Sequence, residues 1–259
     1  MSTGENIQVA KKLVEQALPS SAKESLEASL KYLQLSEDAG YIEDIALANR
    51  YIGYSYRNLG DTERSLRFYF KALRLTRRHK LDEITQPLLN DIGVIYRSKG
   101  NYHKALEYYF QALEGKSFST VGSAYNNIAV IYRLQKEYSK ALQFYVKAKE
   151  IFEAISKGQT GNICITKANI ADIYLKLDQL REAEKSYFEA LKIGQNENLS
   201  QVVLQCLTGL SHLFKKKGDI DTSLQYLSDS LILCEREGFG RKTMSIKLDL
   251  GDVFFERKE

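Results

Sequence analysis

The sequence repeats itself about every 40 residues. Six related segments begin at residues 49, 89, 125, 167, 207 and 247. A second pattern follows each of the first five, and one more copy of that second pattern begins at Glu24. Repeats of this length are typical of stacked supersecondary units, because each unit buries its apolar face only against its neighbours.

Both patterns predict helices. Apolar residues recur at steps of three and four, as Leu66, Tyr69 and Leu73 do in the first full copy. In three copies a glycine followed by Asp or Asn separates the patterns, at residues 60–61, 100–101 and 218–219. Glycine ends a helix in the left-handed conformation, and the Asp or Asn side chain caps the next helix. The chain is therefore expected to be all-α, with about thirteen helices.

Small residues and tyrosines recur in register along the copies. One copy contains Ile92, Gly93, Tyr96, Ala105, Tyr109 and Ala112. The copies at 128–148 and 170–190 repeat this arrangement. The pattern resembles the tetratricopeptide repeat (TPR) family, in which small residues let paired helices approach closely and aromatic rings fill the space between pairs.

The period is near 40 residues rather than the family's usual length of about 34, and the Trp and Pro of the family motif are absent. Long-period TPRs of this kind resemble those of LGN/Pins polarity adaptors. They are also similar to the N-terminal sensor regions of bacterial histidine kinases, diguanylate cyclases and transcription regulators.

The resemblance implies an α-solenoid, a right-handed superhelix of antiparallel helix pairs that forms one domain over residues 1–259. Residues 1–40 are expected to form a degenerate N-terminal helix pair. Residues 41–240 are expected to form five repeats, and residues 241–259 an unpaired C-terminal helix.

Charge and composition limit the classes of partner and the cellular locations that we expect for the chain. The net charge is only +4, which argues against nucleic acid, although residues 41–155 carry an excess of six positive charges. No apolar run is long enough to span a membrane, and the N-terminus is unlike a secretory signal. Three scattered cysteines suit reduced thiols, so a cytoplasmic location is expected.

In the TPR family the first helix of each pair lines a concave groove. Its ligand-facing positions lie three and two before the motif's small residue, and one and four after it. From these positions we predict ten peptide contacts, which are Arg50, Tyr54, Arg57, Asn90, Arg97, Asn126, Asn127, Arg133, Asn169 and Lys215.

The chemistry of these positions suggests a ligand. Arg57, Arg97 and Arg133 recur at one position of consecutive repeats, and arginine pairs with carboxylates through two hydrogen bonds. Asparagine side chains can bond the backbone of an extended peptide. We therefore expect a protein or peptide partner with acidic character. The competing interpretation is that each arginine is an ordinary solvated helix residue.

Catalysis is not expected. The three histidines, at 79, 103 and 212, have no His/Cys spacing that suits zinc, and no phosphate-binding glycine loop is present. No cofactor, metal or catalytic residue is predicted. The expected function is a non-catalytic interaction scaffold.

Two alternatives stay open. The chain could instead be the N-terminal sensory or oligomerising region of a larger bacterial signalling enzyme or transcription regulator. The last copy has no second helix, so Leu248, Leu250, Val253 and Phe254 would leave an apolar side uncovered. Either the chain is part of a longer protein, or this side pairs with a second copy in a homodimer. The further hypothesis of a nucleic-acid-binding repeat is supported only by the basic middle segment.

Overall fold

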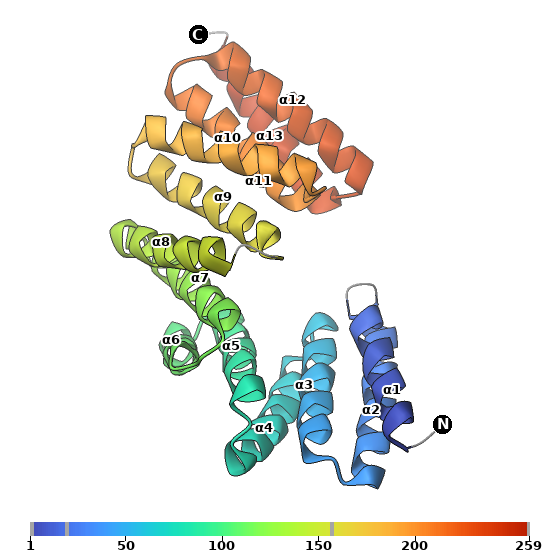
Figure 1. Cartoon of the computed structure of the whole chain (residues 1–259). Helices are drawn as coiled ribbons and strands as arrows, with labels where there is room; N and C mark the ends of the chain where they lie inside the picture. Colours follow the sequence, from blue (N-terminus) through green and yellow to red (C-terminus); the bar gives the residue numbers. More distant parts are fainter. Residues whose placement is uncertain (1–2, 19–20, 156–157, 258–259) are drawn as a thin grey trace. The chain divides into compact units, whose positions relative to one another are not determined.

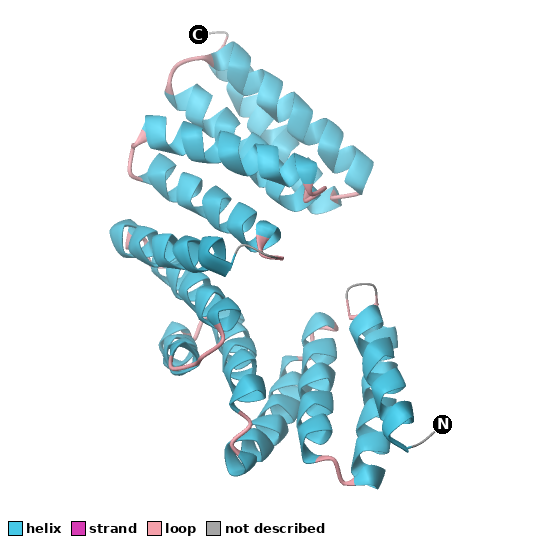
Figure 2. Cartoon of the chain, viewed as in Figure 1, coloured by secondary structure: helices cyan, strands magenta, loops and turns pink. Residues whose placement is uncertain are grey.

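The described part of the chain is entirely helical. The structure is a computed structural model that describes residues 3–18, 21–155 and 158–257. These residues contain thirteen α-helices and no strand (Figures 1 and 2). The prediction of an all-α chain of helix pairs is therefore confirmed. Within the described residues, no helix combines the length and the apolar character needed to cross a membrane.

The helices follow one another through short connections. Their bounds are α1 (Thr3–Ala17), α2 (Ala22–Ala39), α3 (Ile42–Asn58), α4 (Thr62–His79), α5 (Asp82–Ser98), α6 (Tyr102–Leu113), α7 (Phe118–Leu134), α8 (Tyr138–Ile155), α9 (Thr160–Lys176), α10 (Leu180–Asn196), α11 (Ser200–Lys216), α12 (Ile220–Glu237) and α13 (Gly240–Glu256).

The chain divides into two compact units, Met1–Asn127 (unit 1) and Ile128–Glu259 (unit 2). In unit 1 each helix from α1 to α6 packs on the next, and α3 also contacts α5. In unit 2 each helix from α8 to α13 packs on the next, and α9 also contacts α11. The predictions of a single domain and of a right-handed superhelix depend on how the two units join, so both stay predictions.

The helix ends form as the glycine and Asp/Asn pairs predict. Asp61, Asn101 and Asp219 accept hydrogen bonds from the backbone N–H three residues later, at 2.9, 3.1 and 3.1 Å. The glycines before them have φ of 82°, 73° and 81°, a region that residues with a Cβ enter only with strain. These corners fix where each helix pair turns.

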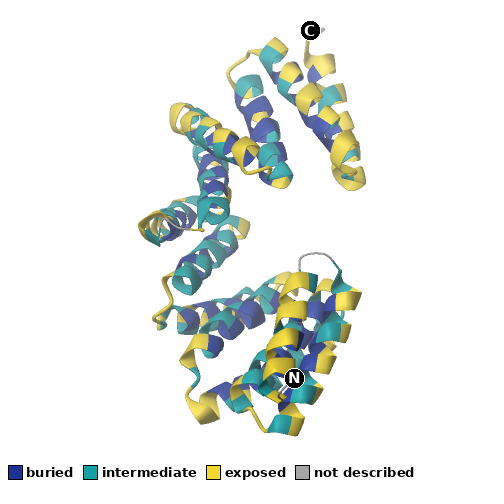
Figure 3. Cartoon of the chain, turned by 45° about the vertical axis from the view of Figure 1, so that its right-hand side comes forward, coloured by how far each residue is buried: buried dark blue, intermediate teal, exposed yellow. Residues whose placement is uncertain are grey.

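Tyrosines of the second helices form the centre of each unit's packing. Tyr69, Tyr109, Tyr145 and Tyr187 are completely buried, as the motif predicts. In Figure 3 buried residues follow the helix faces that contact a neighbour, and exposed residues cover the opposite faces. The tyrosines of the first helices are only partly buried, and Tyr96 stacks on Tyr108 with the two ring planes 4° apart.

The motif glycines allow a close contact, which gives a testable difference. A Cβ at Gly93 would lie 2.5 Å from Cε1 of Tyr109, whereas a Cβ at Gly251 would meet nothing within 4 Å. We expect Gly93→Ala to lower the free energy of unfolding by about 1–3 kcal/mol through overpacking. Gly251→Ala should raise it by about 0.5–1 kcal/mol through helix propensity. Urea unfolding of both variants measures the two changes in the free energy of unfolding. If both substitutions changed it in the same direction, this packing would be contradicted.

In the part of the chain that the structure describes, α13 is covered on one side only. Ile246 and Val253 are buried and Leu250 packs against the core, so the expectation that Val253 and Leu250 lie on an uncovered side is wrong. The opposite side carries Met244, Leu248 and Phe255, which are 65%, 65% and 69% exposed. These three residues recur at helical spacing, so α13 has a second apolar stripe that faces away from α12.

Candidate functional site

Two of the predicted contacts in unit 1 share an ion-pair partner within the chain. Arg50 Nε donates to Asp91 Oδ2 at 2.8 Å, and Arg57 Nη1 lies 3.7 Å from Asp91 Oδ1. Asp91 belongs to α5 and the arginines to α3, so these ion pairs join neighbouring repeats. Of the predicted column Arg57, Arg97 and Arg133, Arg57 lies near this internal carboxylate, and binding of an acidic ligand by the column stays a prediction.

A cavity of about 350 Å³ lies beside these ion pairs. We call it the unit-1 cavity, and it is lined by Leu18, Arg50, Tyr51, Tyr54 and Asp91. The Arg57 guanidinium lies over the Tyr54 ring, 4.4 Å from its centroid, and this cation–π contact fixes that ring. The unit-1 cavity therefore has aromatic and charged walls.

The predicted asparagines of unit 1 differ in their contacts. Asn127 Nδ2 donates to Asn90 Oδ1 at 2.9 Å, so these two side chains link α7 to α5. Asn126 Oδ1 is buried and has no hydrogen-bond partner among the described residues. Arg97 makes no ion pair with any residue that the structure describes. The four residues thus differ in their internal contacts, and their role toward a ligand stays a prediction.

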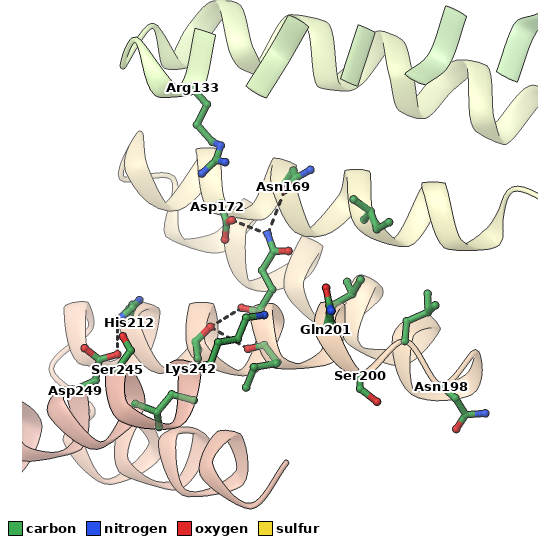
Figure 4. Close-up of a pocket in the computed structure, with 17 residues that line it drawn as sticks. Arg133, Asn169, Asp172, Asn198, Ser200, Gln201, His212, Lys242, Ser245 and Asp249 are labelled. Atoms are coloured by element: carbon green, nitrogen blue, oxygen red, sulfur yellow. Dashed lines mark hydrogen bonds and ion pairs between the residues drawn. The ribbon is translucent and has the colours of Figure 1, made fainter. Parts of the chain in front are cut away.

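Unit 2 contains a larger groove, with a volume of about 870 Å³ (Figure 4). We call it the unit-2 groove. Its walls come from the part of α7 in unit 2, α9, α11 and α13, together with the turn before α11. Many of the side chains that line it are polar without charge, among them Asn169, Asn198, Ser200, Gln201, Gln205 and Thr208.

A hydrogen-bond network forms the wall of the unit-2 groove. Gln205 Nε2 donates to Asn169 Oδ1 at 3.2 Å and to Asp172 Oδ2 at 2.7 Å. From behind, the Tyr187 hydroxyl donates to Asp172 Oδ1 at 2.6 Å. The network ties α9, α10 and α11 together, and it holds the Asn169 and Gln205 amides in fixed orientations.

Arg133 extends from α7 toward Asp172 in Figure 4. Its Nε is buried and has no hydrogen-bond partner in the described part of the chain. A buried donor without an acceptor is costly, and an ionised donor more so. Of the ten predicted contacts, Arg133 and Asn169 lie together in the unit-2 groove.

Burial raises the pKa of Asp172 above its ordinary value of 3.8, although hydrogen bonds from Tyr187 and Gln205 and the charge of Arg133 oppose the shift. The carboxyl group of Asp172 therefore binds its proton more tightly in the folded state than in the unfolded chain. Stability should therefore fall as pH rises from about 4 through the folded pKa, and stay level above it. Asp172→Asn should remove that fall. Urea unfolding of both proteins across this pH range tests it, and parallel curves would contradict it.

The last predicted contact, Lys215, is also paired internally. Its Nζ lies 2.7 Å from Glu256 Oε1, so α11 and α13 share this ion pair. His212, which also lines the groove, is 3.9 Å from Asp249 Oδ2. As with Arg50 and Arg57, the predicted lysine has an acid from the next repeat as its ion-pair partner.

The prediction from family positions missed Gln205, which links Asn169 to Asp172. Gln205 lies six residues before Ser211, the motif's small residue in α11, and so lies outside the four positions considered. Helical spacing gives the signal that was available, because Gln205, Thr208 and His212 share one face of α11 and all line the groove.

Family models match the chain in two regions. One model described as a tetratricopeptide repeat matches residues 120–196. Another with the same description matches residues 52–83 and 88–117. Together they extend over more than half of the chain. No curated protein matches the sequence.

Solved structures share the fold at low sequence identity. BtubC (BKLC) from P. vanneervenii is 18% identical, with a TM-score of 0.66, and the match covers 92% of this chain and 93% of that one. NprR in complex with its cognate peptide NprX is 18% identical, with a TM-score of 0.66 over 99% of this chain and 74% of NprR. A signal transduction ATPase with a tetratricopeptide repeat sensor from Pyrococcus horikoshii is 20% identical, with a TM-score of 0.70 over 98% and 39%.

Proposed function

The chain belongs to the tetratricopeptide repeat family, and from this premise we propose that it is a non-catalytic protein-interaction scaffold that binds a peptide in the unit-2 groove. NprR, which shares the fold, is described in complex with a peptide, and this supports a peptide as the type of ligand. The three cysteines are free and buried, which supports action in a reducing compartment such as the cytoplasm.

The buried Nε of Arg133 is the observation that carries the proposal. This donor lacks an acceptor, and a ligand carboxylate would supply one through a charge-assisted hydrogen bond. The nearby Asp172 is occupied by Tyr187 and Gln205. We therefore propose that an acidic residue of the peptide lies against Arg133, so that the acidic character of the ligand depends on this single arginine.

The amides of the groove suit the peptide backbone. Gln205 uses its NH₂ group for Asn169 and Asp172, which leaves its carbonyl oxygen to accept a backbone N–H of the ligand. Gln201 and Thr208 add polar groups on the same helix. Such contacts bind an extended backbone with little demand on its sequence, so the carboxylate at Arg133 would supply the specificity.

A matched pair of arginine variants tests this proposal. Peptides selected on the whole chain from a random library are expected to be enriched in Asp and Glu. Arg133→Gln should weaken their binding about tenfold or more, because a charge-assisted hydrogen bond is lost. Arg181→Gln makes the same change at an exposed residue of α10 and should leave the affinity unchanged. Equal affinities for both variants in calorimetric titration would remove Arg133 from the site.

The exposed side of α13 favours a second candidate function, oligomerisation within a sensory protein. Met244, Leu248 and Phe255 form an apolar stripe, and the space next to Gly251 is open. A second α13 laid antiparallel would place Met244 against Phe255 and Lys247 against Asp252, which have opposite charges. Light scattering of the whole chain should then show a homodimer that Leu248→Glu dissociates. A monomer at every concentration would exclude it.

A further inference from the structure

Helix α4 carries a stripe of positive charge along its exposed side. Five cationic side chains recur at steps of three and four residues, so they lie on one face of the helix. We call them the α4 stripe, and its members are Arg64, Arg67, Lys71, Arg74 and Arg78. The stripe spans 14 residue steps (78 − 64 = 14), or about 21 Å along the helix. Its four arginines are exposed and its lysine is partly buried.

The chain itself neutralises little of this charge. Arg64 Nε donates to Asp61 Oδ2 at 2.6 Å, whereas the other four members make no ion pair with any residue that the structure describes. Lys71 Nζ lies over the Phe68 ring, 4.9 Å from its centroid, which positions the side chain without neutralising it. Most of the charge of the α4 stripe is therefore available to a partner.

The other second helices do not carry such a stripe. Aligned on the buried small residue that follows the first stripe position, which is Ser65 in α4, each of them has at least one acid at the same five positions. These acids are Glu24, Glu27 and Asp38 for α2, Glu107 and Glu114 for α6, Glu150 for α8, Glu182 and Glu189 for α10, and Asp229 for α12. Like charges at these spacings repel, and the helix dipole favours only the cation in the last turn, Arg78. Helix stability therefore does not account for the stripe, and an anionic partner would offset the repulsion.

The neighbouring helix limits the shape of that partner. Arg77 Nη2 donates to Gln111 Oε1 at 2.9 Å, so α6 lies beside α4. Glu107 and Glu114 are exposed about one turn to either side of Gln111. A broad anionic surface, such as a membrane, would meet these acids together with the stripe and be repelled by them. A narrow row of negative charge would meet the stripe alone.

The rings that the stripe touches argue against a single strand of nucleic acid, which is also narrow. Such strands bind largely by stacking their bases on aromatic side chains. The rings of Tyr56 and Phe68 stack on each other, with their centroids 5.6 Å apart. Arg64 lies over the first ring and Lys71 over the second, at 4.9 Å each, so neither ring offers a base an open face. By contrast, carboxylates on a helix recur at the same steps of three and four residues as the stripe.

We propose that the α4 stripe is a docking site for an acidic helix of a protein partner, whose carboxylates recur at three- and four-residue steps and pair with the arginines. Arginine suits this role, because its guanidinium group forms two parallel hydrogen bonds with a carboxylate. The stripe lies on a second helix and lines neither the unit-1 cavity nor the unit-2 groove. The docking site is therefore independent of the proposed function.

Two alanine-rich helical peptides of identical composition are the probes. One carries five glutamates in a single row at steps of three and four residues, and the other carries them spread around the helix. At an ionic strength of about 0.15 M, the row peptide should bind the whole chain about tenfold more tightly, as measured by fluorescence anisotropy. Arg67→Gln combined with Arg74→Gln should weaken its binding about tenfold or more. Lys185→Gln combined with Lys192→Gln removes two charges at the equivalent exposed positions of α10, and it should leave the affinity unchanged.

Charge reversal gives a gain of binding, which only a folded chain can show. Arg67→Glu combined with Arg74→Glu should bind a row peptide in which lysines replace the glutamates, and the unchanged chain should not. Equal affinities for the two glutamate peptides would overturn the proposal, since net charge alone would then explain the binding. An equal loss in the α10 control would do the same. Tighter binding of a single-stranded oligonucleotide, abolished by the same arginine variant, would assign the stripe to nucleic acid instead.

Discussion

Replacing Tyr187 with alanine is expected to lower the free energy of unfolding by about 3–5 kcal/mol, the range for removal of a large buried aromatic side chain. The ring is completely buried and lies against Gly209, where even an added Cβ would collide with it. Its hydroxyl also donates to Asp172 at 2.6 Å. The substitution therefore leaves a cavity between α10 and α11, and it removes a donor from a buried carboxylate.

Tyr187→Phe separates these two contributions in the same urea unfolding measurement. It keeps the ring and removes only the hydroxyl, so we expect a loss of about 1–3 kcal/mol. Tyr41 is 48% exposed, and Tyr41→Ala should cost much less than Tyr187→Ala. If Tyr187→Ala were no more destabilising than Tyr41→Ala, the packing described for unit 2 would be wrong.

Asp91→Ala is expected to lower the free energy of unfolding by about 2–3 kcal/mol, because it leaves Arg50 and Arg57 without their shared acid. This value lies below the range of about 3–5 kcal/mol for fully buried pairs, since the Arg50 and Asp91 side chains are 24% and 11% exposed. The ion pairs join α3 to α5, so the loss should weaken the contact between neighbouring repeats.

The matched control is Asp221, which pairs with Arg257 at 2.9 Å while their side chains are 77% and 55% exposed. Asp221→Ala removes an ion pair of similar length in open solvent, so it should change stability by less than about 1 kcal/mol. Thermal or urea unfolding of both variants gives the comparison. Equal effects would show that burial does not strengthen the ion pairs of Asp91.

The fold could be predicted from the sequence because its signals are local and repeated. The glycines at 60, 100 and 218, each followed by Asp or Asn, mark the helix ends by backbone conformation and capping, and neither depends on distant residues. The spacing of Gly93 and Tyr109 predicts their contact, since a ring of that size needs a small residue opposite it. How the two units join depends on longer-range packing, which a repeat pattern does not specify.

The candidate site was only partly predictable. Motif spacing brought Arg50, Arg57 and Asp91 to groove positions, but it gave no information on whether these charges would bind each other. That outcome depends on the distance between α3 and α5, and a shift of a few ångströms would separate the partners. Gln205 was missed for a related reason, because its role follows from its two hydrogen-bond partners rather than from its repeat position.

The proposed binding of a peptide in the unit-2 groove is tested most directly by NMR of groove side chains during titration with a selected acidic peptide. We predict saturable shifts of Arg133 Nε–H and of the Asn169 and Gln205 side-chain NH₂ groups, all at one dissociation constant. Arg133→Gln should weaken that binding about tenfold or more. Shifts confined to unit 1 or to the exposed stripe of α13, with these three side chains unmoved, would contradict the proposal.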